Sequence, residues 1–370
     1  MNSGEIKRIA VNTGGGDAPG LNAVIKAVTM AAIKRGWEVY GIKDGYNGVF
    51  LPAHYPNGDG LIRLTPELVK DITAMGGTIL GTTNRGNPLK FPMKTANGTV
   101  VEVDRSDEIV DGLKRNNIDA VVAIGGDGSL SMANEFAKKG VRIVGVPKTI
   151  DNDLDGTSIT FGFDTAVSFA TECIDRLHYT AKAHKRILVV EVMGRYAGWI
   201  ALNSGVSGSA DVILIPEIPY DIKVVAEHLH NSFTEEKDYA IVVVAEGAFP
   251  KDGGYAVIEK EAGKAERLGG AAERVAVQLQ DLTKKEVRTA ILGHLLRGGS
   301  PTTFDRLLSL RFGAAAVRAL EEGHSGVMVA SAPPRMTYIP IEQAIGKLRL
   351  VDPNGDTVRT ARELGICFGE

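Results

Sequence analysis

The stretch AVVAIGGDGS, residues 120–129, shows most directly how this chain is built. Its first five residues are apolar, as in a strand that is buried on both faces of a parallel sheet. Two glycines, Asp127 and Gly128 follow at once, and a helical pattern begins directly after them. A strand, a glycine-rich turn and a helix in this order form the unit from which α/β proteins with parallel sheets are assembled. This stretch therefore predicts an α/β fold.

The same succession recurs along the chain. Residues 6–11 read as a strand, NTGGGDAPG at 12–20 as a glycine-rich loop, and residues 21–35 as a helix. Further apolar runs predict strands at 38–42, 142–146, 187–192, 212–215, 239–245, 288–293 and 326–330. Helical patterns lie at 106–116, 162–183, 196–204 and 304–322. This alternation predicts mainly parallel sheets that are joined by crossover helices.

The region after the strand at 38–42 is less regular. Prolines and glycines crowd residues 52–65, which we expect to be irregular. Residues 66–75 are predicted to form a helix, with Thr65 as its N-cap and Pro66 in its first turn. A second loop rich in glycine and threonine follows at 76–88.

Length, charge and cysteine content bound the kinds of protein this can be. A chain of 370 residues exceeds the size at which one hydrophobic core keeps growing, so two lobes are expected. The net charge of −3 provides no basic field for nucleic acid or a membrane surface. Cys173 and Cys367 are the only cysteines, which argues against a disulfide framework and favours a reducing cytoplasm. Neither a signal peptide nor an apolar run of about 20 residues, as a membrane helix needs, is recognised.

Glycines and charged residues stand together where the predicted strands end. The five pairs are Gly16-Asp17, Gly126-Asp127, Gly194-Arg195, Glu246-Gly247 and Gly293-His294. Ligands of open α/β sheets bind at the carboxyl ends of the strands. Because these ends converge on one edge of a parallel sheet, residues far apart in the sequence can line one site.

The turn at 125–129 has the composition of a phosphate site. Glycines let the backbone approach phosphate oxygens closely, and Ser129 offers a hydroxyl and a helix N-cap. Asp127 is a hard oxygen ligand of the kind that holds Mg²⁺ together with phosphates. The alternative is a tight turn whose aspartate only aids solubility. The loop at 14–16 also precedes a helix and can bind an anion, although its sequence is neither Walker A nor G-x-G-x-x-G.

A second polar stretch, PKTIDND at 147–153, follows the strand predicted at 142–146. It offers the hydroxyl of Thr149 and the carboxylates of Asp151 and Asp153. Two carboxylates at positions i and i+2 can divide their work, one facing a reacting group and the other a cation. The alternative is a solvated turn, because Asp and Asn favour turns.

Cations and one glutamate complete the candidate site residues. Five cations lie at predicted strand ends or in the loops beside them: Arg186, Arg195, Arg288, His294 and Arg297. Arginine suits bidentate recognition of phosphate, so the set favours a phosphorylated substrate, whereas any one of them alone reads as a surface charge. Glu246 can accept hydrogen bonds from sugar hydroxyls, or it is simply a polar residue at a strand end.

Five motifs together resemble the 6-phosphofructokinase family. They are GGDAPGLNA at 15–23, GGDGS at 125–129, PKTIDND at 147–153, MGR at 193–195 and GHLLRGGSP at 293–301, in that family's order. The resemblance covers about residues 6–320. It implies Mg²⁺-dependent transfer of a phosphoryl group to the 1-hydroxyl of fructose 6-phosphate, which gives fructose 1,6-bisphosphate in glycolysis.

The resemblance also implies an architecture. We expect two Rossmann-like α/β lobes with mainly parallel sheets and the active site in the cleft between them. Residues 1–162 with 296–345 would form the lobe that binds ATP and Mg²⁺, and residues 163–295 with 346–370 the lobe that binds fructose 6-phosphate. Closure of such a cleft would exclude water from the transfer.

Roles carry over from the resemblance to matching positions. Asp151 is the base that accepts the hydroxyl proton, with Thr149 and Arg195 in the catalytic set, and Asp127 and Asp153 serve Mg²⁺. The phosphoryl donor is assigned to Gly15, Gly16, Arg85, Gly126, Gly128, Ser129 and Lys148. Fructose 6-phosphate is assigned to Thr149, Arg186, Met193, Gly194, Arg195, Glu246, Arg288, His294 and Arg297. Because the matches of Arg186 and Arg288 reach in from a neighbouring subunit, a homodimer or homotetramer with shared sites is implied.

Four positions depart from the family's pattern. ATP-using bacterial members carry an arginine where this chain has Asn84, and Arg85 follows one residue later. Leu296 replaces a common glutamine. Lys26 and Met30 stand where allosteric members have arginines, so regulation by nucleotides or phosphoenolpyruvate is not implied.

Two alternatives remain for the phosphoryl donor. In the family a glycine after Gly-Gly-Asp accompanies ATP, as Gly128 does here, while a lysine before Thr-Ile-Asp accompanies pyrophosphate, as Lys148 does here. A side chain at 128 would obstruct the α-phosphate of a nucleotide, so Gly128 favours ATP. A pyrophosphate-dependent phosphotransferase is the alternative, and a non-catalytic sugar-phosphate-binding regulatory protein is a remote one. The mixed pattern resembles that of long-chain bacterial phosphofructokinases.

Overall fold

The chain folds into two compact α/β units. A computed structural model describes residues 5–370 except 85, 96, 255–256 and 260–266. The first unit comprises Met1–Thr149, Leu154–Gly162 and Arg297–Leu348, and the second comprises Ile150–Asp153, Phe163–Leu296 and Arg349–Glu370. The chain therefore first leaves one unit for the other within the PKTIDND stretch.

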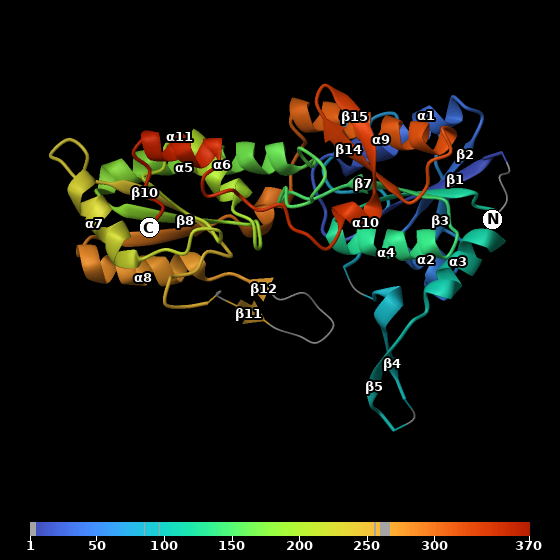
Figure 1. Ribbon diagram of the computed structural model, residues 1–370, viewed down its shortest axis with the longest axis horizontal. Coiled ribbons are helices and arrows are strands. Elements are labelled where there is room, and N and C mark those ends of the chain that lie inside the picture. Colours follow the sequence, from blue (N-terminus) through green and yellow to red (C-terminus); the bar gives the residue numbers. More distant parts are fainter. Residues whose placement is uncertain (1–4, 85, 96, 255–256, 260–266) are drawn as a thin grey trace. The chain divides into compact units, whose positions relative to one another are not determined.

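The first unit contains a seven-stranded sheet (Figure 1). Its strands in spatial order are β15 (Arg335–Pro340), β14 (Val327–Ala332), β7 (Ile143–Pro147), β6 (Ala120–Gly125), β1 (Arg8–Thr13), β2 (Glu38–Ile42) and β3 (Leu61–Arg63). The five central strands pair in parallel, and only the edge strands β3 and β15 are antiparallel. The predicted α/β class with a mainly parallel sheet is confirmed.

Helices cover both faces of this sheet, which explains why its central strands are apolar throughout. On one face Val11, Val122 and Val144 pack with the helices α1 (Leu21–Ile33) and α9 (Thr303–Glu321). The opposite face packs on four helices, namely α2 (Asn47–Phe50), α3 (Ser106–Arg115), α4 (Asp127–Lys138) and α10 (Ile341–Ala344).

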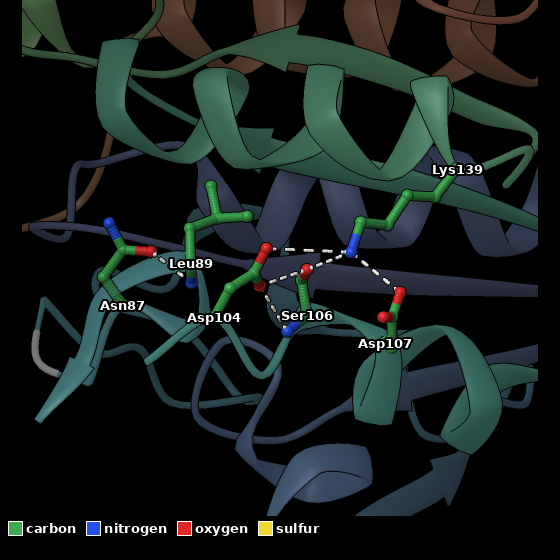
Figure 2. Close-up of polar contacts among 6 residues, drawn as sticks. All are labelled: Asn87, Leu89, Asp104, Ser106, Asp107 and Lys139. Atoms are coloured by element: carbon green, nitrogen blue, oxygen red, sulfur yellow. Dashed lines mark hydrogen bonds and ion pairs between the residues drawn. The ribbon is translucent and has the colours of Figure 1, made fainter. Parts of the chain in front are cut away.

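A polar cluster fixes the carboxyl end of α4 against the start of α3 (Figure 2). The Lys139 ammonium donates to Ser106 Oγ at 2.6 Å and to Asp107 Oδ1 at 2.7 Å. Asp104 Oδ1 accepts the Ser106 N–H at 2.9 Å. Figure 2 also shows the Leu89 N–H donating to Asn87 Oδ1, at 3.0 Å, where the short helix η3 (Pro88–Lys90) begins. Exposed ion pairs contribute little energy, but this cluster anchors the helix whose other end carries the GGDG turn.

The prediction of a helix at residues 66–75 is wrong. Thr65 Oγ1 does accept the Leu68 N–H at 3.3 Å, as a cap would, but only turns and a short 3₁₀ helix, η2 (Ile72–Ala74), follow. Side chains of α1 bind carbonyls of this segment, because Lys26 donates to Lys70 O at 2.5 Å and Asn22 to Met75 O at 3.2 Å. Tertiary contacts thus replace the hydrogen bonds of a regular helix.

The elements of the first unit that were not anticipated include three short strands. The strand β3 lies inside the stretch that was expected to be irregular. An antiparallel hairpin of β4 (Phe91–Lys94) and β5 (Val100–Val103) extends away from the sheet in Figure 1. All four residues of β5 are exposed, so the hairpin lacks the buried face by which strands are recognised in a sequence.

The second unit has a smaller parallel sheet of four strands. In spatial order these are β13 (Val287–Ile291), β8 (Ile187–Val192), β10 (Ala240–Ala245) and β9 (Val212–Leu214). The helices α7 (Ile222–Ser232) and α8 (Ala271–Thr283) pack on one face. On the other lie α5 (Phe163–His184), α6 (Trp199–Ser207) and α11 (Asp356–Glu363) (Figure 1). A short antiparallel pair, β11 (Val257–Glu259) and β12 (Arg267–Leu268), lies apart from this sheet.

In the part of the chain that the structure describes, no helix combines the length and the apolar character that crossing a membrane requires.

Gly313→Ala is expected to destabilise the first unit. A Cβ atom at this position of α9 would lie 2.6 Å from Val24 O and 2.8 Å from Ala27 Cβ, both on α1. Overpacking costs about 1–3 kcal/mol, more than the roughly 1 kcal/mol that alanine gains over glycine in a helix. The control is Gly128→Ala in α4, where nothing lies within 4 Å of the added Cβ. Denaturant unfolding measures both, and a Gly313→Ala protein as stable as the wild type would contradict this packing.

Candidate active site

The glycine loop of the first unit, residues 14–17, is fixed between neighbouring strand ends. The Gly14 N–H donates to Ile124 O at 2.9 Å, and the Gly15 N–H donates to Thr83 O at 3.0 Å. The Thr82 hydroxyl donates to Gly15 O at 2.6 Å. The loop is therefore held in one conformation by the strand β6 and by the second glycine-rich loop.

Ser129 packs directly against this loop. A Cβ atom at Gly14 would lie 2.6 Å from Ser129 Oγ, and one at Gly125 would lie 2.2 Å from Ser129 Cβ, so only glycine fits beside the serine. The prediction that Ser129 is the N-cap of its helix is wrong, since α4 begins at Asp127 and Gly126 occupies the cap position. Ser129 instead lies in the first turn of α4, between two glycines.

Two cations approach the glycine loop. Lys148 is only 4% exposed, and its ammonium donates to Gly16 O. Arg297 Nη1 donates to Asp17 O at 3.0 Å, and a Cβ atom at Gly16 would lie 2.9 Å from the same nitrogen. Arg297, assigned from the sequence to the sugar phosphate, thus lies in the first unit against the loop assigned to the phosphoryl donor.

The amino end of α4 has the properties of an anion site next to a metal ligand. Backbone N–H groups and the helix dipole attract anions at such an end. Asp127 is partly exposed there, and its Oδ1 accepts the Gly346 N–H at 3.0 Å. Among the described residues no three His, Cys, Asp or Glu side chains converge to hold a metal by themselves. One carboxylate in this position fits Mg²⁺, which is usually held by one or two carboxylates with substrate phosphates and water.

The PKTIDND stretch is buried, so the alternative of a solvated turn does not describe it. Thr149, Asp151 and Asn152 are between 3% and 7% exposed, and only Asp153 is partly accessible. The Thr160 hydroxyl donates to Thr149 O at 2.7 Å. Asn152 has a φ of 54°, a left-handed conformation that asparagine adopts more readily than other non-glycine residues.

In the second unit Glu246 holds the loop that follows β8. Glu246 lies just beyond the end of β10, and its Oε1 accepts the N–H groups of Arg195 at 2.9 Å and Gly194 at 3.3 Å. Gly194 has a φ of 145°, which requires glycine, and Arg195 has a left-handed φ of 51°. The Met193-Gly194-Arg195 loop is thus positioned through its backbone, which leaves the exposed Arg195 side chain accessible.

Burial raises the pKa of the Glu246 carboxyl, and the negative charge of Asp151 raises it further. The N–H groups of Arg195 and Gly194 act in the opposite direction. The interaction of the two carboxylates links the base predicted from the sequence to the loop that carries Arg195.

The remaining predicted sugar-phosphate ligands do not share one strand end. Arg186 precedes β8 and Arg288 is the second residue of β13, so both lie at the amino ends of these strands, whereas His294 follows the carboxyl end of β13. Arg186 and Arg288 both pair with Glu286, at 3.5 Å and 2.8 Å. His294 is exposed in the short helix η4 (Gly293–Arg297). Arg85, predicted to bind the donor, lies outside the residues that the structure describes.

Sequence motifs did not point to several residues that hold these loops. Asn22 fixes the start of the second glycine-rich loop, because its amide accepts the Ile79 N–H at 2.9 Å and donates to Gly76 O at 3.2 Å. Asn22 stands within the GGDAPGLNA motif, so its position was a usable signal. Glu217, which binds the N–H groups of Gly198 and Val351, and Arg349, which binds Asn152, belong to none of the motifs.

The pKa of Glu246 predicts a pH-dependent stability difference between the wild type and Glu246→Gln. A carboxyl group whose pKa is raised by folding binds its proton more tightly in the folded chain. Its contribution to the free energy of unfolding therefore falls as the pH rises from the ordinary value of 4.5 through the raised pKa. Glutamine keeps the accepting oxygen but does not titrate. The wild type should thus be most favoured relative to the variant at the acidic end of this window.

Urea titrations from pH 4 upward measure this difference. Glu227→Gln, at an exposed glutamate of α7, controls for the loss of one carboxylate. A difference that stays constant or grows with pH would contradict the raised pKa of Glu246.

Comparisons with known proteins point to one family. The model of the protein family described as Phosphofructokinase matches residues 8–320 of this chain. The chain is 48% identical, over 99% of both sequences, to a Clostridium perfringens protein named ATP-dependent 6-phosphofructokinase 2. It is also 48% identical, over 98% of both sequences, to the ATP-dependent 6-phosphofructokinase of Chloroflexus aggregans. A Streptomyces coelicolor protein named pyrophosphate–fructose 6-phosphate 1-phosphotransferase is 44% identical over 98% of this chain and 100% of its own length.

Solved structures agree with the sequence relatives. Phosphofructokinase from Pichia pastoris, in the T-state, superimposes with a TM-score of 0.76 at 30% sequence identity. The match covers 98% of this chain and 37% of that longer chain.

Proposed function

This chain belongs to the phosphofructokinase family, and we propose that it is an ATP-dependent 6-phosphofructokinase. The reaction transfers the γ-phosphoryl group of ATP to the 1-hydroxyl of fructose 6-phosphate and yields fructose 1,6-bisphosphate and ADP. The observation that carries the proposal is the buried carboxylate of Asp151, which belongs to the same unit as Glu246 and the exposed Arg195. Phosphoryl transfer needs such a base together with positioned cations rather than covalent chemistry.

Asp151 is the proposed general base. It accepts the proton of the 1-hydroxyl as the hydroxyl oxygen attacks the γ-phosphorus, and the bond from that phosphorus to the bridging oxygen of ADP breaks. Thr149 is proposed to bind the sugar phosphate beside it. The low exposure of Asp151 supports this role, because phosphoryl transfer to a sugar hydroxyl needs a site from which water is excluded.

The second unit is proposed to bind most of fructose 6-phosphate. Arg195, with the backbone of Met193 and Gly194, would orient the sugar phosphate, and Glu246 would accept hydrogen bonds from its hydroxyls. Arg186, Arg288 and His294 would bind the 6-phosphate, since arginine binds phosphate oxygens bidentately. We also assign Arg297 to this phosphate. Their common partner Glu286 shows that the Arg186 and Arg288 side chains lie close to each other.

The first unit is proposed to bind the phosphoryl donor. The backbone N–H groups of Gly15, Gly16, Gly126 and Gly128 lie in glycine-rich turns, and Ser129 adds a hydroxyl. Lys148 and Arg85 would neutralise phosphate charge. Asp127 of this unit would hold Mg²⁺, which supplies charge neutralisation on the phosphate oxygens when it is bound. The resemblance assigns Asp153, a residue of the second unit, to the same ion.

The open space at Gly128 favours ATP over pyrophosphate. Nothing lies within 4 Å of a Cβ atom at this position, so the volume beside the start of α4 is available to a nucleotide. The relatives at 48% identity reported above are named as ATP-dependent, while at 44% identity one relative is named as ATP-dependent and another for pyrophosphate. Lys148 does not oppose ATP, since its ammonium contacts the backbone of the glycine loop and can pair with either donor.

The assembly and the location of the protein also stay proposals. A homodimer or homotetramer with sites shared between subunits is supported by the exposure of Arg288, whose side chain is 61% accessible in one chain. A cytoplasmic location is the remaining expectation from the sequence.

A paired assay with ATP and with pyrophosphate tests the proposed function. The purified protein with Mg²⁺ should form fructose 1,6-bisphosphate with ATP and at least about tenfold more slowly with pyrophosphate, a difference of roughly 1.4 kcal/mol. Asp151→Asn should lower kcat about a thousandfold at a similar KM, within the range that a general base contributes. Faster turnover with pyrophosphate would overturn the donor assignment.

A neighbouring aspartate provides the matched control. Asp155 lies two residues after the PKTIDND stretch, and its carboxylate pairs with Lys347 at 3.4 Å. Asp155→Asn should retain wild-type turnover. Near-normal turnover of Asp151→Asn would remove Asp151 from the role of base, and no product with either donor would overturn the proposed function.

A further inference from the structure

The segment Arg349–Val351 contacts the two stretches that carry the proposed chemistry of the second unit. We propose that Arg349 is a positioning residue for phosphoryl transfer, which holds the turn of residues 150–153 in the conformation that aims the Asp151 carboxylate. The inference rests on the proposed function. Arg349 lies outside residues 8–320, which match the family description, and belongs to none of the five motifs.

Arg349 binds the turn directly behind Asp151. Its Nη1 donates to Asn152 Oδ1 at 3.0 Å and lies 3.4 Å from Asn152 O. Its backbone N–H donates to Asp153 O at 2.8 Å. Asn152 has a left-handed φ of 54°, which asparagine tolerates better than other non-glycine residues, and the hydrogen bonds of Arg349 hold the turn in this conformation.

The same arginine is itself held from the opposite side. Its guanidinium lies over the Trp199 ring, 4.6 Å from the ring centroid. The Trp199 Nε1–H donates to Arg349 O at 2.8 Å. Stacking and hydrogen bonding together fix the plane of the guanidinium, so its direction toward Asn152 is determined.

Glu217 joins this segment to the loop that carries Arg195. Its Oε1 accepts the Val351 N–H at 2.9 Å and the Gly198 N–H at 2.9 Å. Gly198 precedes α6, and the Ala197 N–H donates to Gly194 O at 2.9 Å, which closes the Met193-Gly194-Arg195 loop. The segment Arg349–Val351 therefore contacts the turn that carries Asp151 and is joined through Glu217 to the loop that carries Arg195.

These contacts predict an effect on turnover rather than on binding. Arg349 acts through its contacts with Asn152, Asp153 and Trp199 and not by binding a substrate. Its loss should therefore change the direction of the Asp151 carboxylate, while the groups that bind the substrates stay in place. A displacement of about 1 Å at a reacting group can cost on the order of a hundredfold in rate. Lysine keeps the charge but lacks the planar fork that reaches both Asn152 and the Trp199 face.

Arg349→Gln and the matched control Arg362→Gln test the inference in the full-length protein. Arg362 belongs to the same C-terminal region and also lies over an aromatic ring, that of Phe368 at 5.6 Å. It donates to Pro353 O at 2.8 Å and pairs with Glu370, and none of these groups belongs to the turn at 150–153. The measurements are kcat, KM for both substrates, the melting temperature, and hydrogen exchange of the peptide spanning residues 147–155.

For Arg349→Gln we expect kcat to fall at least about tenfold with both KM values within about twofold of the wild type. Exchange in the 147–155 peptide should accelerate, Arg349→Lys should recover part of kcat, and Arg362→Gln should match the wild type in all four measurements. A kcat equal to that of Arg362→Gln would overturn the inference, as would a loss that only follows the melting temperature. If Arg349→Gln does not fold, the test rests on Arg349→Lys. Wild-type kcat and wild-type exchange of the 147–155 peptide in Arg349→Lys would then overturn the inference.

The exchange measurement separates this inference from the proposed function. If the wild type forms no fructose 1,6-bisphosphate, the proposed function fails, and with it the claim of catalysis. Faster exchange at 147–155 in Arg349→Gln alone would still establish the positioning contact, whereas unchanged exchange would overturn it.

Discussion

Buried polar side chains after β7 constrain the structure around them. Lys148, Thr149, Asp151 and Asn152 are all at most 7% exposed, and burying such groups costs several kcal/mol unless hydrogen bonds or charges compensate. The surroundings supply that compensation, as Lys148 donates to the glycine loop and Arg349 to Asn152. An apolar segment would be the more stable choice at this place. The polar residues of this segment are therefore better explained by a role in binding or catalysis than by a contribution to the stability of the fold.

Both units position their loops in the same way, by binding backbone groups with side chains from distant parts of the chain. Lys148 and Arg297 bind carbonyls of the glycine loop, and Glu246 binds the N–H groups of residues 194–195. Loops that are fixed in this manner lose little entropy when phosphates bind, and their donors need no reorganisation during the reaction. The raised pKa of Glu246 is a consequence, because a carboxylate that holds backbone in the interior loses its water.

Apolar periodicity was enough to predict the parallel strands of both sheets, because strands that are mostly buried on two faces have few other interpretations. It failed at residues 66–75, where Lys26 of α1 takes the Lys70 carbonyl that a helix would use. It also failed at the antiparallel edge strands β3 and β15 and at β5, which has no buried face. Motifs located the candidate residues at strand ends. They could not reveal Arg349, whose contact with Asn152 spans 197 positions and depends on how Trp199 is packed. A contact of that kind arises only from the folded chain.

The central claim is that the buried turn at 150–153 presents the base for phosphoryl transfer. The most direct test is a crystal structure of the protein with Mg²⁺, ADP and fructose 1,6-bisphosphate. The account predicts that a carboxylate oxygen of Asp151 lies about 3 Å from O1 of the sugar, the oxygen that received the phosphoryl group. A sugar bound with O1 beyond the reach of Asp151, and with another side chain at that distance, would contradict it.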